Sequence, residues 1–170
     1  MSAAPDAAAA ARQVLAALAR RTETLATAES LTGGLVGELI TDVPGASVSY
    51  LGGVVSYATR LKATLAGVSP ETLTALGPVA ERTAAEMAAG IAARCAATWG
   101  LSTTGVAGPD QQDGHPVGQV FVAVHGPGGR SVVRELRLAG DRSQIRRSSA
   151  AYALALLAEQ LGEEPSGGGG

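Results

Sequence analysis

A serine and a pair of glycines stand together in the segment Thr27-Ala-Glu-Ser-Leu-Thr-Gly-Gly34, between a strand-like stretch and a helical one. Glycine lets a backbone turn sharply and approach a ligand. The start of a helix leaves backbone N–H groups unpaired, and these groups can hold an oxyanion or a phosphate. Ser30 is therefore a candidate nucleophile, and the alternative is an ordinary helix cap formed by Ser30 or Thr32. No Lys-Ser or Lys-Thr follows the glycines, so the segment is not a P-loop.

A nucleophilic serine needs a base, and the chain offers one lysine and two histidines. Lys62 is the only lysine, because the other twelve basic residues are arginine. A desolvated lysine can act as a base near neutral pH, whereas arginine keeps its proton. Tyr57 precedes Lys62 by five residues and can relay the proton or orient the amine. The alternatives are a solvated helix lysine and a base role for His115 or His125, neither of which has the signature of a triad.

A third candidate is the segment Thr104-Gly-Val-Ala-Gly-Pro-Asp110, which continues to Gly118. It combines a predicted strand with a loop rich in glycine. In α/β folds, ligands bind in crevices outside the carboxyl ends of strands. The segment therefore predicts part of a ligand crevice, and the alternative is simply a long turn.

Two arginines stand four residues apart in Gly140-Asp-Arg-Ser-Gln-Ile-Arg-Arg147, at the start of the last predicted helix. This spacing puts Arg142 and Arg146 on one face of the helix. The helix dipole already favours anions in the first turns. The pair therefore suits one phosphate group, and the alternative is a solvated arginine face.

Hydrophobic periodicity predicts the elements that position these segments. Val14, Leu15 and Leu18 share the apolar face of a first helix that ends near Arg20. The run Gly126-Pro-Gly-Gly129 predicts a hairpin between two late strands. The predicted fold is α/β, a three-layer α/β/α arrangement with a mixed, mostly parallel sheet and a C-terminal antiparallel hairpin. The predicted strands cover residues 24–28, 50–57, 100–106, 119–125 and 131–138, and the predicted later helices cover 31–40, short pieces of 59–76, 79–98 and 141–161.

Composition excludes several classes of function. In a chain of 170 residues we expect one domain over residues 1–161 and a disordered tail over residues 162–170. A net charge of −2 and an aromatic content of 3% argue against a nucleic-acid binder. Cys95 is the only cysteine, which excludes an intramolecular disulfide and a cysteine zinc cluster and favours a cytoplasmic protein. We expect no membrane partner, because neither a signal peptide nor a run of about 20 apolar residues is recognisable.

Taken in order, the motifs resemble the C-terminal domain of the CinA family. The segment Ala28-Glu-Ser-Leu-Thr-Gly-Gly34 resembles the family motif A-E-S-x-T-G-G, and Pro44-Gly-Ala-Ser47 resembles its G-x-S turn. The resemblance extends over about residues 11–161. The other matching segments are Tyr57 with Lys62 for Y-x-x-x-x-K, Thr104-Gly-Val-Ala-Gly-Pro109 with His115-Pro-Val-Gly118 for G-I-A-G-P … P-V-G, and Gly140-Asp-Arg142 for G-D-R.

The CinA family is similar to the bacterial nicotinamide-nucleotide amidohydrolases, enzymes of pyridine nucleotide salvage. The resemblance implies that Ser30 is the nucleophile, that Lys62 is its base and that Tyr57 assists. It implies no metal and no cofactor. Because the family is generally multimeric, it also implies a homo-oligomer. The further contacts that we expect with the substrate come from Ser47, Thr104, Gly105 and Arg142, and helical spacing adds Arg146.

The reaction expected from this resemblance is the deamidation of nicotinamide mononucleotide to nicotinate mononucleotide and ammonia. Backbone N–H groups around Thr32, Gly33 and Gly34 would hold the oxyanion, and the two arginines would hold the 5′-phosphate. One alternative is a non-catalytic nucleotide-binding or regulatory module associated with competence. Another is a metal-dependent phosphatase that uses Asp110 and Asp113.

One loop departs from the family pattern. Residues 111–115 read Gln-Gln-Asp-Gly-His, where the family is commonly glycine-rich. His115 also stands where the family often has lysine. A substrate contact at this position is therefore expected to differ.

Overall fold

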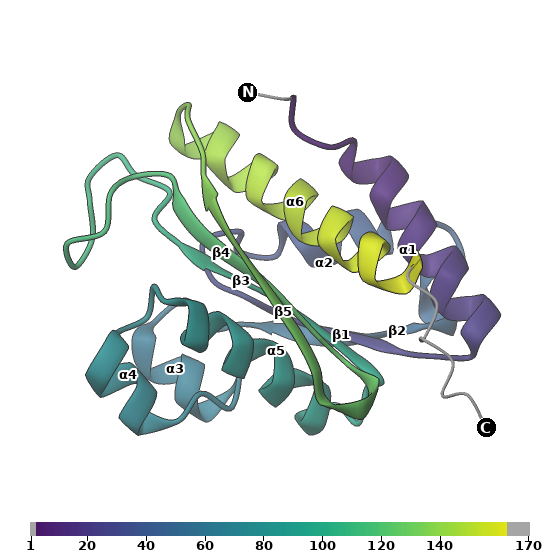
Figure 1. The fold of residues 1–170 in the computed structure, drawn as a ribbon. Coiled ribbons are helices and arrows are strands. Elements are labelled where there is room, and N and C mark those ends of the chain that lie inside the picture. The colour runs from purple at the N-terminus through teal and green to yellow at the C-terminus, as the bar shows by residue number, and fades with distance from the viewer. Residues whose placement is uncertain (1–2, 163–170) are drawn as a thin grey trace, which may run out of the picture.

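The computed structural model describes residues 3–162, which form a five-stranded sheet with helices on both faces (Figure 1). The strands are β1 (Leu25–Glu29), β2 (Tyr50–Val55), β3 (Trp99–Gly105), β4 (Gln119–Gly126) and β5 (Arg130–Arg137). The helices are α1 (Ala7–Arg21), α2 (Leu35–Thr41), α3 (Thr59–Thr64), α4 (Pro70–Leu76), α5 (Glu81–Arg94) and α6 (Arg142–Gly162), and two short 3₁₀ turns are η1 (Ala46–Val48) and η2 (Pro127–Gly129).

The sheet is mixed, with the strand order β2-β1-β3-β4-β5. Strands β2, β1 and β3 run parallel to one another, and β4 is antiparallel to both β3 and β5. The predicted fold class is therefore confirmed, including the antiparallel hairpin near the C-terminus. Because the carboxyl ends of parallel strands meet at one edge of a sheet, the residues that follow β1, β2 and β3 lie close together. These residues include Ser30, Ser56 and Val106.

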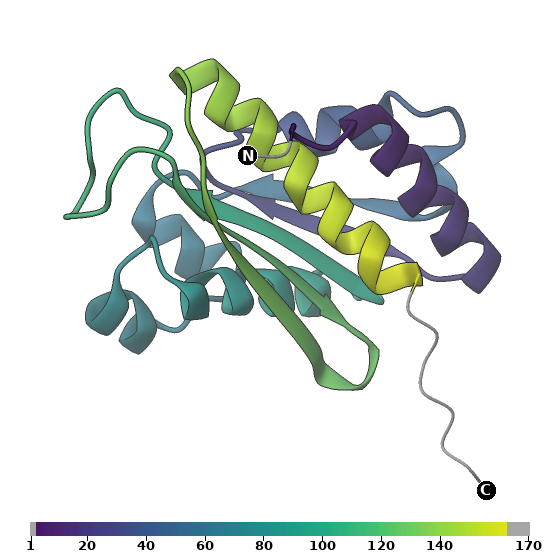
Figure 2. The same cartoon turned by 45° about the horizontal axis from the view of Figure 1, so that its top comes forward.

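Two layers of helices cover the sheet (Figures 1 and 2). Helices α1, α2 and α6 pack on one face, and α3, α4 and α5 lie on the other. The loop between β3 and β4, at the left of both views, extends beyond the end of the sheet. This loop and the start of α3 lie at the edge where the parallel strands end.

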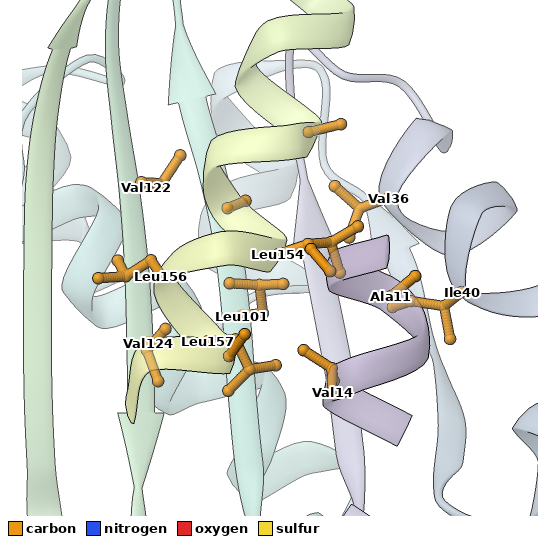
Figure 3. Packing of buried hydrophobic residues seen from close by; sticks show 14 of the residues in the cluster. Ala11, Val14, Val36, Ile40, Leu101, Val122, Val124, Leu154, Leu156 and Leu157 are labelled. Atoms are coloured by element: carbon orange, nitrogen blue, oxygen red, sulfur yellow. The ribbon is translucent and has the colours of Figure 1, made fainter. Parts of the chain in front are cut away.

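The larger core lies between the sheet and the layer of α1, α2 and α6. Figure 3 shows Val14 of α1, Leu101 of β3 and Leu157 of α6 directed into the same region. Val14, Leu15 and Leu18 are all buried, so the predicted apolar face of the first helix is confirmed. Their burial packs α1 against α6 and the sheet.

Several predicted boundaries are wrong. The helix predicted over residues 31–40, with its start near Gly33 and Gly34, begins at Leu35 with Gly34 as its N-cap, because residues 31–34 form a turn. The helix predicted over 79–98 is α5, which ends at Arg94 where the chain turns into a left-handed conformation at Ala96. Gly162 belongs to α6 rather than to the predicted tail, and the rest of that tail, residues 163–170, lies outside the described residues.

Candidate active site

Ser30 and Lys62 meet at the carboxyl edge of the parallel strands. Ser30 follows β1 directly, and its main-chain N–H donates to the carbonyl oxygen of Thr103 in β3 at 3.0 Å. The hydroxyl oxygen of Ser30 lies 3.0 Å from the amine nitrogen of Lys62 in α3. Ser30 is 7% exposed and Lys62 is 2% exposed. The lysine is therefore not a solvated surface residue, and the serine contacts a buried amine rather than capping a helix.

The amine of Lys62 has two further partners, both main-chain carbonyl oxygens. It donates to Ser56 at 2.8 Å and to Tyr57 at 3.4 Å. No carboxylate forms an ion pair with it in residues 3–162. Burial without a countercharge penalises the ammonium form and lowers the pKa of Lys62 from the usual 10.5 to about 8. The amine is thus partly neutral near physiological pH.

The turn after Ser30 is held by the buried carboxylate of Glu29. This carboxylate accepts hydrogen bonds from the hydroxyl of Thr32 at 2.6 Å and from the main-chain N–H groups of Gly34 at 3.2 Å, Val36 at 2.9 Å and Gly37 at 3.1 Å. Gly34 caps α2 with a φ of +104° and has no side chain to satisfy these donors. Glu29 takes that role, which is why α2 starts at Leu35.

Arg142 and Tyr57 form the rim of the site. The guanidinium of Arg142 donates to the carbonyl oxygen of Gly108 at 2.6 Å and to the hydroxyl of Tyr57 at 2.9 Å. Arg142 is the first residue of α6, so its charge stands at the end of the helix that favours anions. The hydroxyl of Tyr57 contacts Arg142, and only the Tyr57 carbonyl contacts Lys62. The expected relay through the Tyr57 hydroxyl is therefore not the arrangement found.

A pocket of about 110 Å³ opens beside Ser30 and Lys62. Pockets that enclose a drug-sized ligand are larger, about 300–1,000 Å³. This pocket therefore suits one small group or ring, with the remainder of a ligand outside. Its walls are formed by Ser30, Leu31, Tyr57, Thr59, Lys62, Pro78, Val79, Thr104, Gly105, Val106, Ala107, Gly108, Asp110, Gln112 and Arg142.

Six of the expected site residues line the pocket. Ser30, Tyr57, Lys62 and Arg142 are four of them, and Thr104 and Gly105 come from the end of β3. Thr104 is buried, and its hydroxyl donates to the carbonyl oxygen of Pro78 at 2.6 Å. Thr104 therefore shapes the wall, and its hydroxyl proton is already used.

Two of the N–H groups expected for an oxyanion, those of Gly33 and Gly34, are bonded within the structure. The N–H of Gly33 donates to the carbonyl oxygen of Ser30 at 3.0 Å, and that of Gly34 donates to Glu29. Thr32 is buried, and its hydroxyl contacts Glu29 and Thr103. Because these groups serve the turn itself, the expected substrate contacts at Thr32, Gly33 and Gly34 are not brought to the pocket.

Arg146 and Ser47 also do not line the pocket. The guanidinium of Arg146 donates to the carbonyl oxygens of Leu31 at 2.9 Å and Thr32 at 3.0 Å. Ser47 lies in η1, which precedes β2, whereas the pocket lies beyond the end of β2. A strand of six residues spans roughly 20 Å. Neither residue lines the pocket beside Ser30 in this chain, and the substrate contacts expected of them stay predictions.

Several pocket residues had no predicted contact with the mononucleotide. Asp110 and Gln112 belong to the glycine-rich loop that the sequence marked as part of a crevice, and Asp110 was named only in the metal-dependent alternative. Pro78 and Val79 precede α5, and no sequence motif marks them as residues of a binding site. Neither His115 nor His125 lines the pocket, and His115 instead contacts Gln119 at 2.9 Å.

In the described part of the chain, no three His, Cys, Asp or Glu side chains gather as metal ligands. Among the helices of residues 3–162, none combines the length and the apolar character needed to cross a membrane.

The family model that describes the sequences of CinA C-terminal domains matches residues 7–161, nearly the whole described chain. The chain belongs to the CinA C-terminal domain family. A CinA-like protein of Frankia casuarinae is 50% identical over 153 residues, covering 90% of this chain and 35% of that protein. A CinA-like protein of Thermosynechococcus vestitus is 45% identical over 147 residues, covering 85% of this chain and 35% of the relative. This CinA domain thus spans about a third of the length of these relatives.

Solved CinA structures share the fold of this CinA domain. The competence/damage inducible protein from Agrobacterium tumefaciens superposes with a TM-score of 0.88 at 33% identity, over 96% of this chain and 100% of that one. The competence damage-inducible protein A from Klebsiella pneumoniae superposes with a TM-score of 0.89 at 31% identity, over 94% and 99% of the two chains. The layered architecture around the pocket is therefore that of the family.

Proposed function

We propose that this CinA domain is a serine-type amidohydrolase that deamidates nicotinamide mononucleotide. The observation that carries the reaction type is the contact of 3.0 Å between the Ser30 hydroxyl and the Lys62 amine inside a pocket. A nucleophile within hydrogen-bond reach of a base is the arrangement that acyl transfer needs. The choice of substrate rests on the resemblance to the nicotinamide-nucleotide amidohydrolases.

The environment of Lys62 supports its role as a base. A neutral amine has two N–H bonds and one lone pair. The carbonyl oxygens of Ser56 and Tyr57 accept the two N–H groups, so the lone pair is left for the hydroxyl of Ser30. In the ammonium form the third N–H points at the same oxygen. Deprotonation of Lys62 therefore converts the contact from one that blocks the serine into one that activates it.

In the proposed reaction, Ser30 attacks the carboxamide carbon while its proton moves to Lys62. The tetrahedral intermediate collapses as Lys62 passes that proton to the departing nitrogen, which leaves as ammonia. Water then attacks the acyl-enzyme, with Lys62 as base, and releases the carboxylate product and free Ser30. In this second half-reaction Lys62 returns the proton of the water to the Ser30 oxygen, so the amine is neutral again at the end of each half-reaction.

Pocket size and rim charge support the placement of the substrate. The small pocket suits the pyridine ring with its carboxamide directed at Ser30. The ribose and phosphate would then lie outside, on the side of Arg142. A guanidinium carries five N–H donors and binds phosphate well. Arg142 uses two of its nitrogens on Gly108 and Tyr57, and this fixes the charge at the rim.

The test is the release of ammonia from nicotinamide mononucleotide by the wild-type protein and by Ser30→Ala. We expect turnover from the wild type and a loss of about 10⁴-fold or more in the variant, because the nucleophile is removed. The variant should still bind the mononucleotide. Binding without any ammonia release by the wild type would instead support the non-catalytic, regulatory module. Activity that survives in Ser30→Ala at a tenth of the wild-type rate would exclude the serine mechanism.

A further inference from the structure

The carboxylate of Glu29 is the most heavily bonded acidic group beside the pocket, yet it does not line the pocket. Glu29 is 3% exposed and receives four hydrogen bonds, from the Thr32 hydroxyl and from three main-chain N–H groups at the start of α2. Within residues 3–162 it forms no ion pair. A buried carboxylate is costly unless donors satisfy it. Here the donors come from the turn that follows Ser30 and from the first residues of α2.

Arg146 binds other backbone groups of the same turn. This guanidinium donates to the carbonyl oxygens of Leu31 and Thr32. Glu29 thus accepts hydrogen bonds from N–H and O–H groups of the turn and of α2, and Arg146 donates hydrogen bonds to C=O groups of the turn. The two side chains come from β1 and α6, whose backbones are fixed by the sheet and the large core. The backbone that carries Ser30 is therefore restrained by both side chains.

We propose that Glu29 is a positioning residue for Ser30, acting through the turn and not on the substrate. This proposal rests on the proposed role of Ser30 as a nucleophile. The Lys62 amine is anchored independently, on Ser56 and Tyr57, so any relaxation of the turn lengthens the contact between serine and amine. A misplacement of about 1 Å can reduce a rate by about 100-fold. Loss of Glu29 should therefore lower kcat and leave KM nearly unchanged, because the pocket wall is intact.

Two substitutions of Glu29 separate positioning from proton transfer. Glu29→Ala removes the acceptor, and we expect kcat to fall by about 100-fold. Glu29→Gln keeps an amide oxygen in place of Oε1, which serves Thr32, Gly34 and Val36, and it loses only the acceptor for Gly37. Its kcat should lie between those of the wild type and Glu29→Ala. Both variants should keep the acid limb of the pH–rate profile, because Lys62 remains the base.

Glu86 provides a matched control. Its carboxylate accepts hydrogen bonds from the main-chain N–H of Ser69 at 3.0 Å and the hydroxyl of Thr72 at 2.8 Å, at the start of α4. It therefore holds a helix start in the same manner but does not line the pocket. Glu86→Ala should keep kcat within about threefold of the wild type. Amide hydrogen exchange should accelerate over residues 69–76 in this variant, and over residues 30–37 in Glu29→Ala.

The combined measurements decide the proposal. Wild-type kcat in Glu29→Ala would overturn it, and so would an equal loss of kcat in Glu86→Ala. A loss of about 10⁴-fold in Glu29→Gln, with disappearance of the acid limb, would make Glu29 the base and also overturn it. If the wild type releases no ammonia, the proposed function fails by itself. Hydrogen exchange then decides on positioning: faster exchange of residues 30–37 in Glu29→Ala alone supports it, and unchanged exchange overturns it.

Discussion

The amine of Lys62 lies 3.0 Å from the hydroxyl of Ser30, although the two residues are 32 positions apart in the chain. The parallel pairing of β1 with β2 brings them together. Ser56, just after β2, donates its N–H to the carbonyl oxygen of Glu29 at 2.8 Å, and its own carbonyl accepts from Lys62. The pair is therefore built on the backbone of two strand ends, and its protonation should control the reaction proposed for it.

Lys62→Arg should be nearly as inactive as Lys62→Ala. Arginine keeps a positive charge but cannot release its proton near neutral pH, so it cannot accept the proton of Ser30. We expect both variants to lose about 10³-fold or more in kcat, in the range of a missing base and its positioned nucleophile. Ammonia release at saturating substrate measures this loss. Substantial activity in Lys62→Arg would show that the charge of Lys62 matters and that the base lies elsewhere.

The pH dependence of the wild type should report the pKa of Lys62. Only the neutral amine can act as the base, and burial lowers this pKa to about 8. The rate should therefore fall about tenfold per pH unit well below pH 8 and level off above it. The limb should persist in kcat, because the base acts in the bound complex. A flat profile from pH 6 to pH 9 would contradict a base of this pKa.

The stability of the folded protein should also depend on pH through the lowered pKa of Lys62. The pKa of Lys62 is about 8 in the folded protein and 10.5 in the usual solvated state, so between these values the unfolded chain binds more protons. The contribution of Lys62 to stability therefore rises with pH from about 8 to about 10.5. Lys62→Met has no such group. The Tm of the wild type minus that of Lys62→Met, measured at both ends of this range, should become more positive, and a constant difference would argue against a depressed pKa.

Arg142→Ala should weaken the binding of nicotinamide mononucleotide. One charge-assisted hydrogen bond contributes about 1.5–3 kcal/mol, which corresponds to roughly a 10- to 150-fold rise in KM. Tyr57→Phe removes only the hydroxyl partner of Arg142 and should change KM by less than about fivefold. Free nicotinamide, which lacks the phosphate, should be a poor substrate for the wild type and should lose nothing further in Arg142→Ala. Normal binding of the mononucleotide by Arg142→Ala would move the phosphate site elsewhere.

Arg146→Ala should act on kcat rather than on KM. Its guanidinium is bound to the carbonyl oxygens of Leu31 and Thr32, so its removal loosens the turn of Ser30 without removing a ligand contact. A drop of about tenfold or more in kcat corresponds to the loss of one such bond, at about 1.5–3 kcal/mol. Arg147→Ala, which removes a surface arginine bonded to Ser143, is the control. A rise in KM with unchanged kcat would restore Arg146 as a phosphate contact.

Much of the fold and the centre of the site could be predicted from local pattern. The spacing of Val14, Leu15 and Leu18 requires a buried helix face, because helical periodicity puts these side chains on one side. Ser30 and Lys62 were recognisable by residue type, as a serine at a glycine corner and as the only lysine of the chain. These features can be recognised without the tertiary structure, because they depend on residues that are close in sequence or on chemistry that few residue types can supply.

Local sequence patterns could not decide which polar groups form hydrogen bonds with one another. Helical spacing correctly puts Arg142 and Arg146 on one side of α6, but four residues advance a helix by about 6 Å. Only Arg142 therefore reaches the pocket, while Arg146 meets the carbonyl groups of the turn. Ser47 was assigned to the site by motif, yet β2 separates it from the pocket. The sequence by itself determined the layered fold and the candidate pair of serine and lysine. Only the tertiary structure decided the hydrogen-bond partners of Glu29, Arg142 and Arg146. The reason is that the packing of the sheet and helices, and not spacing along the chain, sets the distances between separate elements.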